Sequence, residues 1–165
     1  MEETSAQTAE NRYKRHYPIS WEQLHRDARA LAWRLHEKKL SWKGIVAITR
    51  GGLVPAAVIA RELDIHYIDT VCITSYDWQE QGKARILKAV EGSGSDLLLI
   101  DDLVDTGATA KVVKKMLPEA FFATVYAKPA GKPLVDAYVT EVSQDTWILF
   151  PWDSESRFVK PIAGK

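Results

Sequence analysis

The chain has 165 residues, 46% of them hydrophobic, and its 22 lysine and arginine residues balance its 22 aspartate and glutamate residues. This length and composition predict one globular domain with a single buried core. A net charge of zero argues against a protein that coats nucleic acid, although a local cluster of charge can still bind a small anion. The single cysteine, Cys72, excludes an intrachain disulfide, and no apolar stretch reaches the ~18 residues needed to cross a membrane. We therefore expect a cytoplasmic protein.

The first regular pattern follows residues 1–18, which are expected to form a mobile tail. Ser20 and Gln23 have the spacing of a capping box, and Ile19 is placed to pack on Leu24. Apolar residues then recur at helical spacing: Leu24, Ala28, Leu31 and Leu35. The pattern predicts an amphipathic helix with one buried face.

Two short apolar runs, at 45–49 and 67–74, are expected to be strands. Between them, Arg50, Gly51 and Gly52 are expected to form a turn, and a helix is expected from Pro55 to about residue 63. The following segment, 75–95, is charged and weakly patterned. It is expected to be either a surface loop or a hairpin.

The second half of the chain continues the alternation of strands and helices. A fully apolar run at 97–100 predicts a central strand that ends at Asp101 and Asp102, and a helix at 108–117 and a strand at 121–127 follow. The alternation predicts an α/β fold, an open and mostly parallel sheet with helices on both faces. From residue 131 the segments are short and interrupted by prolines. We expect them to form a small C-terminal hood, 131–165, within one domain that spans 19–165.

The segment after the central strand carries the functional signal. Ligands of open α/β sheets bind at the carboxyl ends of the strands, where Asp101 and Asp102 are expected. Asp105 and the residues up to Thr109 then lead into a helix N-terminus, which attracts phosphate. Two carboxylates for sugar hydroxyls beside an anion site suit a ribose 5-phosphate. The alternative is a capped helix with solvated acids. The chain contains neither a Walker A motif nor a G-x-G-x-x-G fingerprint.

Segment 100–109 resembles the signature of the type I phosphoribosyltransferases. Four further stretches resemble the branch of that family that acts on 6-oxopurines: TRGGLVP at 49–55, DTVCITSYD at 69–77, AKPAGKPLV at 127–135 and DTWILFPWD at 145–153. The resemblance extends from about residue 19 to the C-terminus. It implies the type I phosphoribosyltransferase fold and an enzyme that transfers the phosphoribosyl group of 5-phosphoribosyl 1-diphosphate to xanthine and guanine, and more weakly to hypoxanthine.

For the phosphoribosyl donor, the resemblance assigns the ribose hydroxyls to Asp101 and Asp102 and the 5-phosphate to 106–109. It assigns the pyrophosphate to a strained peptide at Arg50 and Gly51, with Mg²⁺ as cofactor near Asp102 and a second ion held through water by Asp153. The donor site as a whole would contain Arg50, Gly51, Asp101, Asp102, Leu103, Val104, Asp105, Thr106, Gly107, Ala108 and Thr109.

For the purine, the resemblance makes Asp105 the catalytic group, facing N7 as a general base or an electrostatic partner. Lys128 would donate to the 6-oxo group, because an ammonium can only donate hydrogen bonds and does not suit the amino group of adenine. Trp147 would stack on the base, and the backbone of Ile148 would bind the exocyclic group at the 2-position.

The chain departs from the family pattern at two positions and in the segment before Ile19, which is longer than the family leads us to expect. Ala108 stands where a glycine is common, and Gly82 stands where the family's mobile loop carries an arginine; Lys83 and Arg85 are candidate replacements. Segment 75–95 is expected to close over the diphosphate. The resemblance also implies a homotetramer, in some members peripherally associated with the inner membrane. Two alternatives remain: a non-catalytic regulator that senses the diphosphate, and a transferase specific for hypoxanthine.

Overall fold

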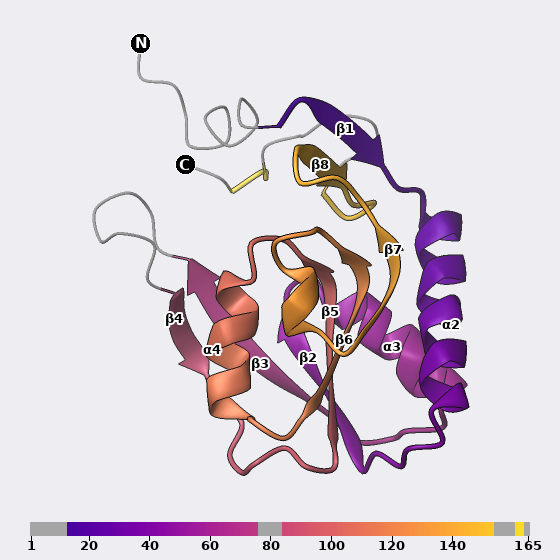
Figure 1. Ribbon diagram of the computed structural model, residues 1–165, viewed down its shortest axis with the longest axis vertical. Helices are drawn as coiled ribbons and strands as arrows, with labels where there is room; N and C mark the ends of the chain where they lie inside the picture. The colour runs from indigo at the N-terminus through magenta and orange to yellow at the C-terminus, as the bar shows by residue number, and fades with distance from the viewer. Residues whose placement is uncertain (1–12, 76–83, 154–160, 164–165) are drawn as a thin grey trace.

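The fold is built on a six-stranded sheet, seen in the computed structural model, which describes residues 13–75, 84–153 and 161–163 (Figure 1). The strands lie in the order β4-β3-β2-β5-β6-β7, and all neighbours are parallel except β3 and β4. Their bounds are β2 (Gly44–Thr49), β3 (Ile68–Ser75), β4 (Ala84–Lys88), β5 (Leu97–Val104), β6 (Phe121–Ala127) and β7 (Ala137–Glu141). The expected mostly parallel α/β sheet is confirmed.

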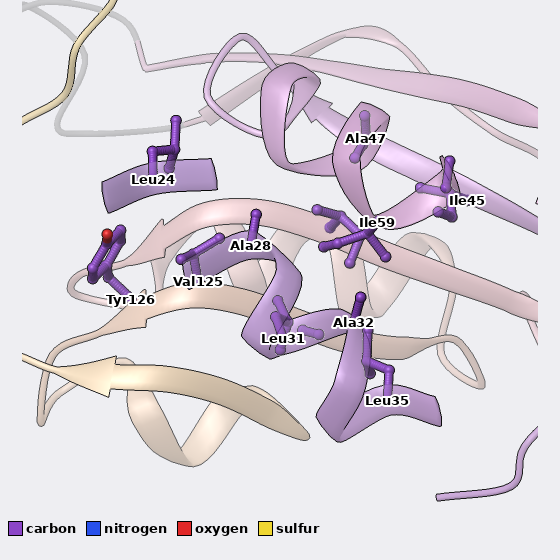
Figure 2. Close-up of a cluster of buried hydrophobic side chains, with 14 of the residues drawn as sticks. Leu24, Ala28, Leu31, Ala32, Leu35, Ile45, Ala47, Ile59, Val125 and Tyr126 are labelled. Atoms are coloured by element: carbon purple, nitrogen blue, oxygen red, sulfur yellow. The ribbon is translucent and has the colours of Figure 1, made fainter. Parts of the chain in front are cut away.

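Helices cover both faces of this sheet. Helices α2 (Trp21–Glu37) and α3 (Leu53–Glu62) pack on one face, and α4 (Ala108–Met116) packs on the other (Figure 1). Side chains of β2 and β5 alternate between the two faces, as the period of a strand requires. Figure 2 shows the cluster under α2 and α3, where the labelled side chains are Leu24, Ala28, Leu31, Ala32, Leu35, Ile45, Ala47, Ile59, Val125 and Tyr126.

The predicted amphipathic helix is α2. Ser20 caps it, since the backbone N–H of Gln23 donates to the Ser20 hydroxyl at 3.1 Å. The four residues of the predicted apolar face are all buried. The second helix, α3, begins at Leu53 and not at Pro55, which lies in its first turn, where a proline costs no backbone hydrogen bond.

Strand β5 is longer than the sequence predicts. It was expected to end at Asp101 and Asp102, but it continues to Val104 because Leu103 and Val104 still pair with Tyr126 and Ala127 of β6. The predicted strand end is therefore wrong. The two aspartates belong to the carboxyl-terminal part of the strand, which fixes their backbone more firmly than a loop would.

The region after β6 contributes to the main sheet as well as to a separate strand pair. A 3-10 turn (Lys132–Leu134) leads to β7, which pairs with β6 in parallel. Strand β8 (Thr146–Leu149) instead pairs in parallel with β1 (Arg15–Pro18). In Figure 1 this pair lies beyond the end of the sheet at which α4 begins. Part of the expected tail is thus a strand, whereas residues 1–12 lie outside the described residues.

Segment 75–95 contains strand β4, which pairs antiparallel with β3, so the hairpin interpretation holds for this part. Arg85 lies on β4 with an exposed side chain. Residues 76–83, including Gly82 and Lys83 of the expected lid, lie outside the described residues. In the part of the chain that the structure describes, no helix is long and apolar enough to cross a membrane.

Candidate active site

The predicted site residues meet where β2, β5 and β6 end. The loop after β2 and the acidic pair on β5 are in direct contact at Gly51, where an added Cβ would lie 2.3–2.6 Å from the carboxylate atoms of Asp102. Only a glycine allows the backbone to approach a carboxylate this closely. The peptide bond between Thr49 and Arg50, just before this contact, is cis. Two motifs that are fifty residues apart in the sequence therefore form one surface.

Asp101 and Asp102 are electrostatically costly in the ligand-free protein. Desolvation raises the pKa of Asp101 well above its ordinary value, and repulsion from Asp102 adds to the effect. Desolvation also raises the pKa of Asp102, to about 6, against hydrogen bonds that lower it. The backbone N–H of Asp102 donates to Asp101 at 2.9 Å. Such a pair would be stabilised by a cation or by hydroxyl donors.

Asp153 lies close enough for its charge to affect Asp102. Its negative charge acts to raise the pKa of Asp102, after the larger effect of desolvation. The pKa of Asp153 itself is raised by desolvation, and the Arg50 guanidinium acts in the opposite direction. The structure thus brings Arg50, Asp102 and Asp153 into one neighbourhood. Among the described residues, no group of three or more histidine, cysteine or acidic side chains has the geometry of a metal site.

Asp105 is the most highly connected side chain of the site. It follows β5, and its carboxylate accepts from Lys128 Nζ at 2.9 Å, from Gln144 Nε2 at 2.7 Å and from the Tyr13 hydroxyl at 2.9 Å. The Asp105 side chain is 30% exposed, whereas that of Lys128 is only 1% exposed. A buried ammonium needs a partner, and Asp105 is the partner here. The predicted neighbourhood of Asp105 and Lys128 is therefore present.

The backbone after β6 holds Lys128 against Asp105. The N–H of Lys128 donates to the carbonyl of Val104 at 2.9 Å, which extends the pairing of β5 and β6 by one step. An added Cβ at Gly131 would lie 2.7 Å from the carbonyl oxygen of Asp105. The loop after β6 therefore packs directly on the acidic loop, so the position of Lys128 is set by two backbone contacts.

The expected phosphate loop leads into α4 as predicted. Gly107 has a φ of 85°, a left-handed conformation that favours glycine, and α4 begins at the next residue without a side-chain cap. The Thr106 hydroxyl accepts from the N–H of Ala108 at 3.4 Å. Ala108 is the first helical residue and is exposed, so its methyl group fits where the family often has glycine. Thr109 is half-buried in the same turn.

Leu103 and Val104 differ from the rest of the expected donor site. Both lie within β5: Val104 is buried against α4, and Leu103 packs on the opposite face. Their side chains serve the core, and the loop that can surround a phosphate begins at Asp105.

Trp147 and Ile148 are placed by the pairing of β8 with β1. Trp147 is half-buried and Ile148 is buried. The ring of Trp147 contacts the ring of Tyr13, with centroids 5.0 Å apart and planes inclined by 55°. The Tyr13 ring also lies 4.3 Å from Lys128 Nζ. Through Tyr13, the aromatic group on β8 is thus joined to Asp105 and Lys128.

Two residues of the site were missed from the sequence, Tyr13 and Gln144. Tyr13 stands in a segment that reads as a polar tail, and no periodicity connects it with a residue 92 positions later. Gln144 lies in the turn between β7 and β8, where its Oε1 accepts from the N–H of Ala130 at 2.9 Å while its amide donates to Asp105. A glutamine in a turn is common, and nothing in the local sequence predicts that Gln144 connects Ala130 and Asp105.

A model of the phosphoribosyl transferase domain matches residues 20–158 of the chain. The chain is 69% identical over 156 residues to the xanthine-guanine phosphoribosyltransferase of Desulfotalea psychrophila, with 94% of this chain and 97% of the relative covered. It is 67% identical to that of Nitratidesulfovibrio vulgaris, with 94% and 95% covered. A solved purine phosphoribosyltransferase from Pyrococcus horikoshii superposes with a TM-score of 0.73 at 29% identity, with 88% and 99% covered. The chain therefore belongs to the phosphoribosyltransferase family.

Proposed function

We propose that the chain transfers the 5-phosphoribosyl group of 5-phosphoribosyl 1-diphosphate to xanthine and guanine, which gives the nucleoside 5′-monophosphate and pyrophosphate. The observation that carries the proposal is the position of Asp105. It lies between the acidic end of β5 and the N-terminus of α4, and its carboxylate accepts a hydrogen bond from Lys128 at the end of β6. The names of the two bacterial relatives support xanthine and guanine as the acceptors.

At the donor end, the acidic pair would bind the ribose and the turn after it would bind the phosphate. Asp101 and Asp102 can accept hydrogen bonds from the two ribose hydroxyls, which would offset the desolvation that raises the pKa of both carboxyls. The backbone N–H groups at the start of α4 can donate to the 5-phosphate. Arg50 and the adjoining glycine peptide can bind the pyrophosphate through charge and backbone donors.

Mg²⁺ fits the residues present at this end. Asp102 is desolvated and lies within the field of Asp153, so a cation beside it would remove an unfavourable charge. Magnesium prefers one or two carboxylates together with substrate oxygens and water, and it does not require a cage of protein ligands. When bound, the ion would neutralise charge on the pyrophosphate leaving group. Asp102 would be its direct ligand, and Asp153 would act through water.

At the acceptor end, Lys128 would donate to the 6-oxo group and Asp105 would accept the proton from the purine. A carboxylate held by Lys128 and Gln144 has a fixed orientation, which is what a general base requires. Trp147 would stack on the base, a contact that contributes roughly 1–3 kcal/mol. The backbone of Ile148 would bind the group at the 2-position. We include in this proposal that the described residues after β7, 142–153, form a hood over the purine, and that the protein is a homotetramer.

The transition state of this transfer has oxocarbenium character, so alignment and charge stabilisation supply most of the rate. The donor carboxylates, Asp105 and Lys128 are positioned by strands or by backbone contacts, which suits this need. A regulator that only senses the diphosphate would have no use for a buried Lys128 on Asp105, nor for Trp147, which is linked to both through Tyr13. This grouping favours the enzyme.

A panel of nucleobases tests the proposed function. With the donor and Mg²⁺ present, we expect turnover of xanthine and guanine, weaker turnover of hypoxanthine and none of adenine, measured by release of pyrophosphate. Removal of the metal with a chelator should abolish turnover. Binding of the donor by calorimetry without turnover of any base would instead identify a sensor.

Lys128→Gln is expected to raise the KM for guanine by roughly 10–100-fold, because the loss of a charged hydrogen bond costs about 1.5–3 kcal/mol. The KM for the donor should change less, since the Lys128 ammonium contacts Asp105 and not the acidic pair that would hold the ribose. Lys132→Gln is the matched control: this lysine is four residues away and pairs with Glu141 on the surface. Equal KM values for guanine in the Lys128 variant and the parent would show that Lys128 does not bind the purine.

A further inference from the structure

Tyr13 contacts three groups that the proposed function assigns to the purine. Its hydroxyl donates to Asp105 at 2.9 Å, its ring lies against Trp147, and its face lies 4.3 Å from Lys128 Nζ. A phenol ring is flat, aromatic and polar at one edge, as a 6-oxopurine is. The base and the phenol would use the same carboxylate and the same indole, so they would compete for these groups.

We propose that Tyr13 occupies the purine site of the ligand-free protein as an intramolecular competitor, which the nucleobase displaces. The inference rests on the proposed function. It assigns to the N-terminal segment a role in setting the affinity for the purine, separate from the binding of the phosphoribosyl donor.

Tyr13 lies at the end of the β1–β8 strand pair and not within it. The chain is anchored immediately after it: the N–H groups of Lys14 and Arg15 donate to the carbonyl of Asp145 at 2.9 and 3.3 Å, and β1 then pairs with β8. Tyr13 itself precedes the strand. Rotation of its side chain and of the backbone before Lys14 can therefore empty the site while the strand pair remains intact.

The Tyr13 ring also lies over the buried ammonium of Lys128. The Lys128 side chain is 1% exposed. Its ammonium lies beside the Asp105 carboxylate and over the face of the Tyr13 ring. A cation over an aromatic face is stabilised most when both are desolvated. The Tyr13 ring thus shields the Lys128 ammonium from water, as a bound purine would.

Competition of this kind makes a quantitative prediction. The apparent affinity for the purine is reduced by the fraction of molecules in which the site is open. Tyr13→Ala is therefore expected to lower the KM for guanine, and the dissociation constant of the product nucleotide measured by calorimetry, by roughly 3–10-fold. The KM for the donor should remain within about twofold. Tyr13→Phe keeps the ring but loses the bond to Asp105, so its KM should lie between those of the parent and the alanine variant.

Lys14→Ala is the matched control, because it alters an exposed side chain of the same segment and retains the backbone bond to Asp145. It should behave as the parent does. An increase in the guanine KM of Tyr13→Ala would make Tyr13 a wall of the purine site and would overturn the competition, as would an unchanged KM. A parent that is inactive with every base would overturn the proposed function, whereas an active parent with an unaffected alanine variant would overturn this inference alone.

Discussion

Asp105→Asn is expected to lower kcat for guanine by roughly 100–10,000-fold, the range that a general acid or base contributes. The amide keeps the size of the side chain and can still accept a hydrogen bond from Gln144 or Lys128, but it cannot take a proton from the purine. Steady-state rates at saturating donor, guanine and Mg²⁺ measure the effect. Donor binding, followed by calorimetry, should persist because Asp105 lies beyond the acidic pair that would hold the ribose.

Asp136→Asn provides the control for this experiment. Asp136 accepts from the N–H of Phe122 at the opposite end of β6, so the same chemical change is made away from the site. Thermal unfolding of both variants should be recorded, since Asp105 also neutralises the buried Lys128. An Asp105→Asn protein that turns over guanine at the parent's rate would remove Asp105 from the mechanism.

Asp102→Asn is expected to stabilise the ligand-free protein at pH 8 while it abolishes use of the donor. Folding raises the pKa of Asp102 from 3.8 to about 6, chiefly through desolvation. A group with a raised pKa in the folded state favours folding below its unfolded pKa, and this contribution is lost as the pH rises through about 6. The ionised carboxylate at pH 8 therefore costs roughly 3 kcal/mol, which the neutral amide avoids.

Urea unfolding in metal-free buffer at pH 8 and pH 5 measures this effect. The gain in unfolding free energy from Asp102→Asn should be large at pH 8 and smaller at pH 5, where the parent carboxyl is mostly protonated. Asp69→Asn is the opposite control: a hydrogen bond from Lys88 lowers the pKa of Asp69, so this variant should lose stability at pH 8. A gain for Asp102→Asn that is the same at both pH values would show that desolvation of the charge is not its cause.

The two predictions describe different uses of a carboxylate at one site. Desolvation makes the negative charge of Asp102 unfavourable unless a cation or a sugar is bound. The carboxylate of Asp105, in contrast, is already paired with Lys128. In the proposed function, the first arrangement would favour ligand binding at the expense of the stability of the ligand-free protein, and the second would fix a group for proton transfer. The contacts with Lys128 and Gln144 hold the Asp105 carboxylate in one orientation, as the proposed reaction would need.

The amino-acid sequence by itself predicted α2, α3, α4 and the strands between them, and it indicated the residues at the strand ends that carry the proposed chemistry. Period and capping predicted α2 from Ser20 onward, and an unbroken apolar run predicted β5 as a central strand. The acidic loop and Gly107 before α4 indicated a sugar phosphate site, because these residue types have local reasons to stand together. Local rules were sufficient here, since each signal lies within about ten residues.

Only the tertiary structure decided which distant segments complete the site. The extent of β5 depends on its pairing with β6, and the strand β1 exists because β8 offers it a partner. Tyr13 meets Asp105 across 92 positions, and Gln144 meets it across 39. Such contacts produce no periodic pattern in the sequence, because the two residues become neighbours only once the chain has folded. The physical reason is that pairing and packing across the sheet are non-local, whereas capping, alternation and turn preferences are local.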